Sequence, residues 1–244
     1  MVDSAVGNQI PKVGSKLRRP KAGPVTRHDI IVGAANLTLD CGVEGLSIKA
    51  VAKTVGVTPA DVYGLFIDLD HLQLAVVSES VSLIRRTVEQ CMASLDLDNA
   101  VTIISQVLDA LRDATRAEPG LAQAVVCGRH SRNPLLRQAV LDAFESISGD
   151  VTNQLRLSTR LANCRPDDLL ASSAILILLG FNYVEMLLYC DAGSRREKQL
   201  TETTFRQFFV VAFGLDSFGA VYPHDAVLPT GDSDDSAILP RVHK

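Results

Sequence analysis

Two short helical patterns meet at a glycine in the run Ser47 to Phe66, SIKAVAKTVGVTPADVYGLF. Ser47 can cap the first helix by accepting a backbone N–H bond, and Leu46 can pack onto Val51 one turn later. Gly56 can end that helix, because glycine tolerates the left-handed conformation that a C-terminal cap requires. Few folds accommodate two helices joined by so tight a turn, so this stretch constrains the rest of the chain.

The second helix is expected to run from Pro59 to about Phe66. Thr58 can cap it, and Pro59 suits its first position because the missing N–H has no helical partner there. Val62 and Phe66 are four residues apart and should face inward, with Leu65 beside them. The outer face is left with Pro59, Ala60, Asp61, Tyr63 and Gly64. The pattern predicts a helix-turn-helix, whose second helix enters the DNA major groove.

A wider pattern surrounds this motif. Its members are Ile30, Ala34, Ala35, Leu37, Gly42, Ser47, Val51, Ala52, Gly56, Val57, Val62, Tyr63, Phe66 and Leu72. On these residues the segment from Thr26 to Val77 resembles the DNA-binding domain of the tetracycline-repressor (TetR) family of one-component regulators. The resemblance covers about the first third of the chain. Recognition helices of that family commonly carry basic or imidazole side chains beside the tyrosine, and a lysine often opens the next helix. Here these places hold Gly64, Leu65 and Leu69.

The charge distribution favours a nucleic-acid partner for the N-terminal part. The chain has a net charge of −4, yet residues 1–66 hold eight Lys and Arg against five Asp and Glu. Residues 1–24 are expected to form a flexible basic arm, rich in Gly, Pro, Lys and Arg. Such an arm is either a solvated terminus or, beside a helix-turn-helix, a contact for DNA phosphates or the minor groove.

The expected DNA contacts combine the arm with the motif. The Tyr63 hydroxyl can donate to a phosphate, and Lys49 is placed for a second phosphate contact. Ala60 or the Thr58 methyl could touch a thymine methyl, whereas Asp61 could accept from cytosine N4 or simply favour the helix start. The complete set is Lys16, Arg18, Arg19, Lys21, Arg27, Ser47, Lys49, Thr58, Pro59, Ala60, Asp61 and Tyr63.

The remaining chain is predicted to be helical throughout, which gives an all-α fold. Asp68 can cap a fourth helix that continues to about Ser94, long enough to leave the DNA-binding unit. Further helices are expected at 99–117, with Val101 and Leu108 inward, and at 121–130, 133–162, 169–190 and 202–215. The expected domains are 25–70, a helix-turn-helix domain; 71–215, a larger effector-binding and dimerisation domain; and 216–244, a loose tail.

Two of these helices point to a homodimer. The helix from Leu169 to Cys190 is apolar on nearly every side, so it must lie at a domain centre or in a subunit interface. The helix from 202 to 215 adds Phe205, Phe208 and Phe209. In the resembled family, the last long helices of two subunits pack as a four-helix bundle. The resemblance therefore implies a dimer through roughly 167–191 and 201–214, and such a dimer would read a palindromic operator.

The effector site is harder to locate. A ligand pocket between helices is mostly apolar, with a few polar groups that fix orientation. The candidates are polar residues within or beside apolar patterns, and each could equally be a hydrogen-bonded core or interface residue. They are Arg112, Arg129, His130, Asn182, Tyr183 and Glu185. We expect a small apolar or amphipathic effector of unknown identity.

Other classes of protein have little support in the sequence. No nucleotide-binding loop, metalloprotease motif or nucleophile elbow is present, so we expect neither an enzyme nor a cofactor. The five cysteines form no C-x-x-C pair and are expected to be buried residues in a reducing cytosol rather than metal ligands. No uninterrupted apolar run reaches the ~20 residues of a membrane span, and no secretory signal is apparent. We therefore expect a cytoplasmic protein.

The sequence thus predicts a ligand-responsive DNA-binding transcriptional regulator of two domains. Repression, rather than activation, is a tendency of the resembled family. The alternative is an all-helical ligand-binding or dimerisation protein that keeps the motif with weakened or lost operator binding. The absence of Lys and Arg between Thr58 and Phe66 favours this alternative.

Overall fold

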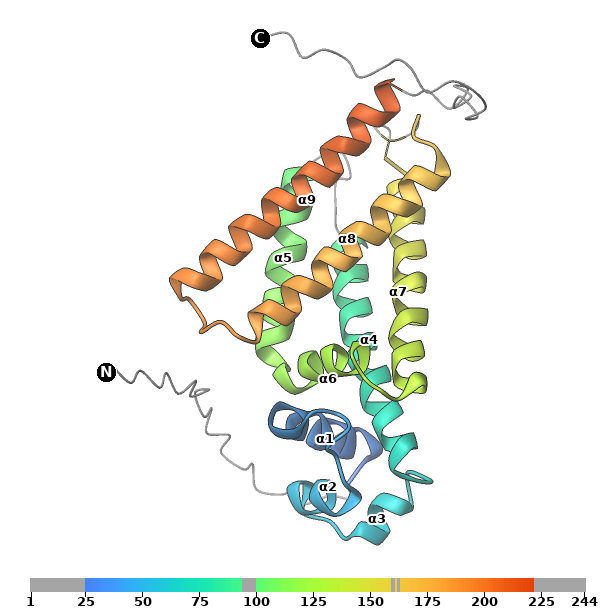
Figure 1. Ribbon diagram of the computed structural model, residues 1–244, viewed down its shortest axis with the longest axis vertical. Coiled ribbons are helices and arrows are strands. Elements are labelled where there is room, and N and C mark those ends of the chain that lie inside the picture. Colours follow the sequence, from blue (N-terminus) through green and yellow to red (C-terminus); the bar gives the residue numbers. More distant parts are fainter. Residues whose placement is uncertain (1–24, 94–99, 159–160, 162, 222–244) are drawn as a thin grey trace, which may run out of the picture.

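The computed structural model describes residues 25–93, 100–158, 161 and 163–221. All regular secondary structure in these ranges is helical (Figure 1). The helices are α1 (Arg27–Cys41), α2 (Ile48–Val55), α3 (Pro59–Tyr63), α4 (Leu69–Ala93), α5 (Ala100–Ala117), α6 (Pro119–Arg129), α7 (Pro134–Leu155), α8 (Pro166–Leu187) and α9 (Arg195–Val221). The predicted all-α fold is confirmed.

Helices α1 to α3 form a small unit at one end of the molecule (Figure 1). Ser47 caps α2 by accepting a hydrogen bond from the Ala50 N–H, and Gly56 ends α2 in the left-handed conformation with φ of 83°. Thr58 caps α3, and Pro59 occupies its first position. These features of the motif lie where local sequence rules put them.

Helix α3 is shorter than expected. It ends at Tyr63, and both the Leu65 and the Phe66 N–H groups donate to the Val62 carbonyl in a closing turn. This turn leads Phe66 into the core but leaves Leu65 40 % exposed, so the expected inward position of Leu65 is wrong.

Helix α4 connects the small unit to the rest of the molecule. Its start is capped by Asp68, whose carboxylate accepts the His71 N–H at 2.7 Å. Leu72 and Val76 are buried near its beginning, and Ile84 and Val88 are buried about two and three turns after Val76. One continuous helix of 25 residues therefore has one end near the motif and the other among the C-terminal helices.

In the larger unit, α5, α6 and α7 pack directly on α4. Helix α8 packs between α7 and α9, and α9 also packs on α5. Three expectations fail here. Helix α7 ends at Leu155 rather than near residue 162, because tighter turns follow it. Val101 is 49 % exposed rather than inward. Helix α9 begins at Arg195, behind a Ser194 cap on the Glu197 N–H, and runs to Val221, so residues 216–221 are helical instead of tail.

A close contact between α1 and α6 joins the two units (Figure 1). A methyl group at Gly120 would lie 2.6 Å from the Ala35 carbonyl carbon, so the two backbones touch. The Thr38 hydroxyl lies 3.1 Å from the Gly120 carbonyl oxygen and donates to it as well as to Ala35. Nearby, the Glu44 carboxylate accepts hydrogen bonds from the Ser131 hydroxyl and the Arg132 N–H, both at 2.6 Å.

The cysteines differ in their surroundings. Cys91, Cys164 and Cys190 are buried as expected, and Cys127 is half-buried. Cys41 is exposed in the last residue of α1, so the expectation of burial is wrong for this residue. Burial raises the pKa of the Cys91 thiol, as expected for an unreactive core residue. Within the described ranges, no three His, Cys, Asp or Glu side chains are placed to hold a metal ion.

Candidate DNA-binding surface and effector cavity

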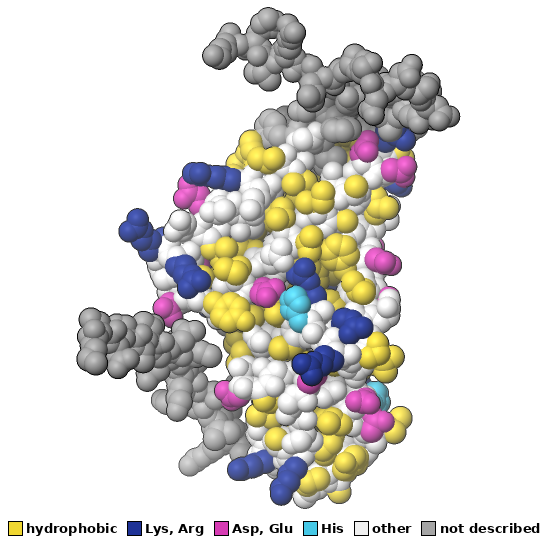
Figure 2. Space-filling model, in the orientation of Figure 1, with side chains coloured by type: hydrophobic (Ala, Val, Ile, Leu, Met, Phe, Trp, Pro, Cys, Tyr) yellow, Lys and Arg dark blue, Asp and Glu magenta, His cyan; other side chains and the backbone are white. Residues whose placement is uncertain are grey.

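The outer surface of the helix-turn-helix is exposed at the end of the molecule. Pro59, Ala60, Asp61 and Tyr63 are all exposed, with 56 % of Tyr63 accessible. Figure 2 shows hydrophobic side chains over the α3 end of this surface and basic side chains beside them, towards α2. The exposed face of α3 is therefore open to a large partner such as a DNA groove.

Thr58 and Asp61 use their polar atoms on each other. The Thr58 N–H and hydroxyl both donate to Asp61 Oδ2, at 2.8 and 2.7 Å, and the Thr58 oxygen accepts the Asp61 N–H at 3.2 Å. The Thr58 hydroxyl and N–H bonds lower the pKa of the Asp61 carboxyl. Both residues thus stabilise the start of α3 in a reciprocal capping box. Of the two roles considered for Asp61, the structure shows the helix-start role.

Basic residues lie around α3 rather than on it. Lys49 and Lys53 are exposed on α2. The Arg27 guanidinium lies 4.9 Å from the centre of the Phe66 ring, where a cation–π contact holds an otherwise exposed side chain. Ser47 is committed to capping α2. Lys16, Arg18, Arg19 and Lys21 lie outside the described residues, so their contacts with DNA stay predictions.

A cavity lies inside the larger unit, between α4, α5, α7, α8 and α9. Its volume is about 120 Å³, and its walls include Ile84 and Val88 of α4, Leu111 of α5 and Phe181 of α8. Among the described residues, no charged side chain lines it, and the only hydroxyl at its wall is that of Ser158. Apolar cavities of roughly 150 Å³ stay dry and bind small apolar molecules, so this space suits a hydrocarbon group.

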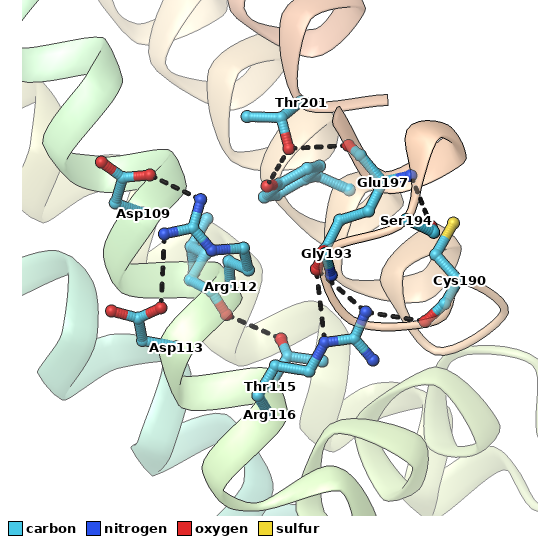
Figure 3. A network of polar contacts seen from close by, with 12 residues as sticks. Asp109, Arg112, Asp113, Thr115, Arg116, Cys190, Gly193, Ser194, Glu197 and Thr201 are labelled. Atoms are coloured by element: carbon cyan, nitrogen blue, oxygen red, sulfur yellow. Dashed lines mark hydrogen bonds and ion pairs between the residues drawn. The ribbon is translucent and has the colours of Figure 1, made fainter. Parts of the chain in front are cut away.

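A polar network outside the cavity fixes the start of α9 (Figure 3). The Arg116 guanidinium donates to Glu197 Oε1 at 2.9 Å and to the Cys190 carbonyl at 2.7 Å, and the Gly193 N–H donates to Glu197 Oε2. The Glu197 carboxylate is buried. Burial raises its pKa, but the bonds from Arg116 and Gly193 outweigh this, and the net pKa of Glu197 is lowered. The sequence patterns did not predict this network. The one signal that could have located it is Ser194, a residue type that favours the start of a helix, three positions before Glu197.

No protein-family model matches this sequence. Solved structures do match it, over most of its length. SCO4454, a TetR-family transcriptional regulator from Streptomyces coelicolor, shares 21 % identity with a TM-score of 0.59, over 78 % of this chain and 95 % of its own. The fatty acid degradation regulator FadR from Bacillus halodurans shares 13 % identity with a TM-score of 0.63, over 80 % and 98 %. The chain has the fold of TetR-family transcriptional regulators.

A third structure with this fold contains both a small ligand and DNA. AibR, in complex with isovaleryl coenzyme A and operator DNA, shares 17 % identity with a TM-score of 0.56, over 75 % of this chain and 97 % of its own. At these identities the likeness establishes the TetR fold and leaves the ligands of the present chain to its own residues.

Within this TetR fold, none of the six predicted ligand residues lines the cavity. Arg129 Nη1 donates to Asn182 Oδ1 at 3.0 Å, and His130 Nε2 lies 3.7 Å from Glu185 Oε2, in two pairs between the end of α6 and α8. These pairs lie on the surface. For these four residues the structure shows contacts with a residue of another helix, which is the second of the two roles considered for them.

Of the remaining two predicted ligand residues, Arg112 is labelled in Figure 3, and Tyr183 contacts Thr201, which is also labelled there. Arg112 forms ion pairs with Asp109 at 2.7 Å and Asp113 at 3.4 Å. The Tyr183 hydroxyl shares a hydrogen bond of 2.8 Å with Thr201, and burial raises the pKa of Tyr183. The cavity walls instead consist of residues such as Ile84 and Leu111, which no sequence pattern distinguishes from ordinary core.

Helices α8 and α9 of the TetR fold expose an apolar surface. Leu170, Ile175, Leu178 and Met186 of α8 are 38–48 % exposed, and Val210 of α9 is 69 % exposed. Figure 2 shows hydrophobic side chains gathered over the middle of the molecule, where these helices lie. By length and composition α8 is also the one described helix that could cross a membrane. It also packs on α7 and α9, and 33 % of its apolar window is buried inside the structure.

Proposed function

We propose that this chain is a ligand-responsive transcriptional regulator. One observation carries the proposal: a single TetR fold has an exposed helix-turn-helix at one end and an apolar cavity at the other, and α4 reaches both. Leu72 and Val76 of α4 pack in the core beside the motif, and Ile84 and Val88 line the cavity. An effector that fits one position of α4 better than another would shift the DNA-binding equilibrium.

The proposed DNA-binding species is a homodimer through α8 and α9, and its target is a palindromic operator. The exposed apolar residues of these helices support this, because large apolar patches on soluble proteins usually mark interfaces. The basic arm, with Lys16, Arg18, Arg19 and Lys21, adds phosphate contacts. We place the protein in the cytoplasm, as a repressor without enzymatic activity.

The proposed effector enters the cavity with an apolar group, and is itself apolar or amphipathic. The walls support this, because they include the apolar side chains of Ile84, Leu111 and Phe181. Burying an uncharged polar group there without a hydrogen-bond partner would cost about 2–7 kcal/mol, and burying a charge would cost more. A straight-chain alcohol such as 1-octanol is a suitable probe. It should raise the Tm of the wild type. It should not raise the Tm of Gly180→Leu, because Gly180 lines the cavity and the new leucine side chain would occupy the space that the probe needs.

The test of DNA binding begins with selection of sequences from a random duplex pool. The selected site should bind with an affinity that falls steeply with salt, as phosphate contacts require. Tyr63→Ala and deletion of residues 1–24 should each weaken binding, and Tyr63→Phe isolates the contribution of the hydroxyl. If the folded, dimeric protein enriches no sequence even at low salt, the regulator proposal is wrong.

The second candidate is a ligand-binding or dimerisation protein with weakened or lost operator binding. It is favoured by α3, which has no Lys or Arg and holds Asp61 in its first turn. In that case selection would return no preferred sequence, while 1-octanol would still raise the Tm of the wild type.

A further inference from the structure

The reading face of α3 comprises Pro59, Ala60 and Tyr63, which are exposed on the second helix of the motif. Few polar side-chain atoms on or beside this face remain free to read a base. The Thr58 hydroxyl is both donor and acceptor within the capping box, and Asp61 Oδ2 accepts two hydrogen bonds from Thr58. The carboxylate is therefore held back against the start of its own helix.

Basic side chains are also missing from this part of the chain. No Lys or Arg occurs from Thr54 to Ile84, a segment the structure describes completely. The contact that most often specifies a base, a bidentate Arg or Lys on guanine O6 and N7, is thus unavailable from α3 or the start of α4. The exposed lysines, Lys49 and Lys53, lie on α2, where they suit phosphates.

The reading face consequently offers mainly carbon to the groove: the Pro59 ring, the Ala60 methyl and the Tyr63 ring. Among the four bases, only thymine presents an apolar group in the major groove, its C5 methyl. We propose that α3 selects its operator by van der Waals contact of Pro59 and Ala60 with thymine methyl groups, so that each half-site is specified by thymines rather than guanines. This inference rests on the proposed function, because it requires α3 to enter a major groove.

The test uses the full-length protein and the DNA site that selection returns. Each thymine of one half-site is replaced in turn by deoxyuridine, which keeps every hydrogen-bonding group and removes only the methyl. Loss of one buried methyl contact should weaken binding about 3- to 5-fold, and loss of its symmetry mate as well should give roughly 10- to 20-fold. Replacing each guanine by 7-deazaguanine, which lacks the N7 acceptor, should leave the affinity unchanged.

A protein variant assigns the effect to α3. Ala60→Gly removes the methyl of the reading face, so the deoxyuridine penalty at the contacted thymine should shrink towards zero in this variant. Circular dichroism and sedimentation of the variant establish that it is folded and of wild-type size. If it does not fold, Ala60→Ser serves in its place, because it adds a hydroxyl to the contact and should also change the penalty.

The outcomes separate the two proposals. A selected site that binds equally well with deoxyuridine at every thymine, or that loses affinity on 7-deazaguanine substitution, overturns the thymine inference and leaves the regulator proposal standing. A pool that yields no preferred sequence overturns both. A deoxyuridine penalty that persists undiminished in Ala60→Gly and in Pro59→Ala excludes these two residues as the readers.

Discussion

The small unit α1–α3 and the larger unit α5–α9 provide hydrogen-bond partners for their polar groups by different means. In the small unit the capping groups are local: Thr58 and Asp61 are three residues apart, as are Thr26 and Asp29. In the larger unit the main polar contacts join distant residues, such as Arg116 and Glu197, which are 81 positions apart. The first unit therefore follows from short-range rules, whereas the second depends on how long helices pack.

The largest predicted effect concerns the apolar face of the larger unit. Ile175→Glu would bury an unpaired carboxylate in the proposed α8–α9 interface, so the dimer Kd should rise by roughly 100-fold or more. Sedimentation velocity over a concentration series measures it. The matched control is Leu141→Glu, since Leu141 of α7 is similarly exposed but outside this interface. Equal behaviour of the two variants would contradict a dimer through α8.

The contact between the two units gives the next largest effect. Gly120→Ala forces a methyl against the backbone of Ala35, and no flexible side chain is available to yield. We expect a loss of about 1–3 kcal/mol in the free energy of unfolding, measured by urea denaturation. A separate early transition would show that the two units have come apart. Unchanged stability would mean that α1 and α6 are not in backbone contact.

The buried carboxylate of the larger unit should make stability depend on pH. Glu197→Gln removes the charge that Arg116 and Gly193 face, at a cost of about 1–3 kcal/mol at pH 7. The folded-state pKa of Glu197 lies below its ordinary value near 4.5, so its contribution is present above that pH and is lost as the pH falls through the folded pKa. Wild type and variant should converge in acid. A constant difference from pH 7 to pH 3 would contradict this assignment.

In the small unit, the capping box provides the corresponding local test. Thr58→Ala removes the side chain that caps α3 and should cost about 1 kcal/mol, while Thr58→Ser should retain most of the stability. Thermal unfolding of both variants, read by circular dichroism, makes the comparison. If serine were no better than alanine, the hydroxyl would not be the stabilising group.

The smallest effect should have the opposite sign. Gly149 lies inside α7, and a methyl group there would meet nothing within 4 Å. Gly149→Ala should therefore raise stability by about 0.5–1 kcal/mol through helix propensity alone. It is also the matched control for Gly120→Ala, because both change a helical glycine to alanine. A destabilised Gly149→Ala would show hidden crowding on that side of α7.

The same contrast explains what the sequence could and could not predict. The caps at Ser47 and Thr58 and the turn at Gly56 depend on residues within four positions, and the structure has them where expected. Local rules do not predict that α3 ends at Tyr63. A helix that continued to Phe66 would turn Leu65 inward, whereas the structure leaves Leu65 exposed. Helix α9 begins before the predicted residue 202, because Ser194 caps a first turn whose residues are charged and show no apolar pattern.

The cavity could not have been predicted in this way. Ile84, Leu111 and Phe181 come from three helices, and whether they touch each other or enclose a space depends on packing that no single segment encodes. The predicted polar residues lie outside its wall, and two of them, Arg129 and Asn182, hydrogen-bond to one another. The residues that define the cavity are apolar ones whose neighbours do not fill the space between them.

The backbone contact at Gly120 bears on how far such a protein can be treated as modular. A hybrid protein made by grafting α1–α3 onto another helical unit would need three features in that unit: a glycine opposite Ala35, a carbonyl oxygen that accepts the Thr38 hydroxyl, and a pair of hydrogen-bond donors for Glu44. A graft that kept only α4 continuous would bring two backbones into collision. A recombination site must therefore preserve the contact between α1 and α6 as well as the continuity of α4.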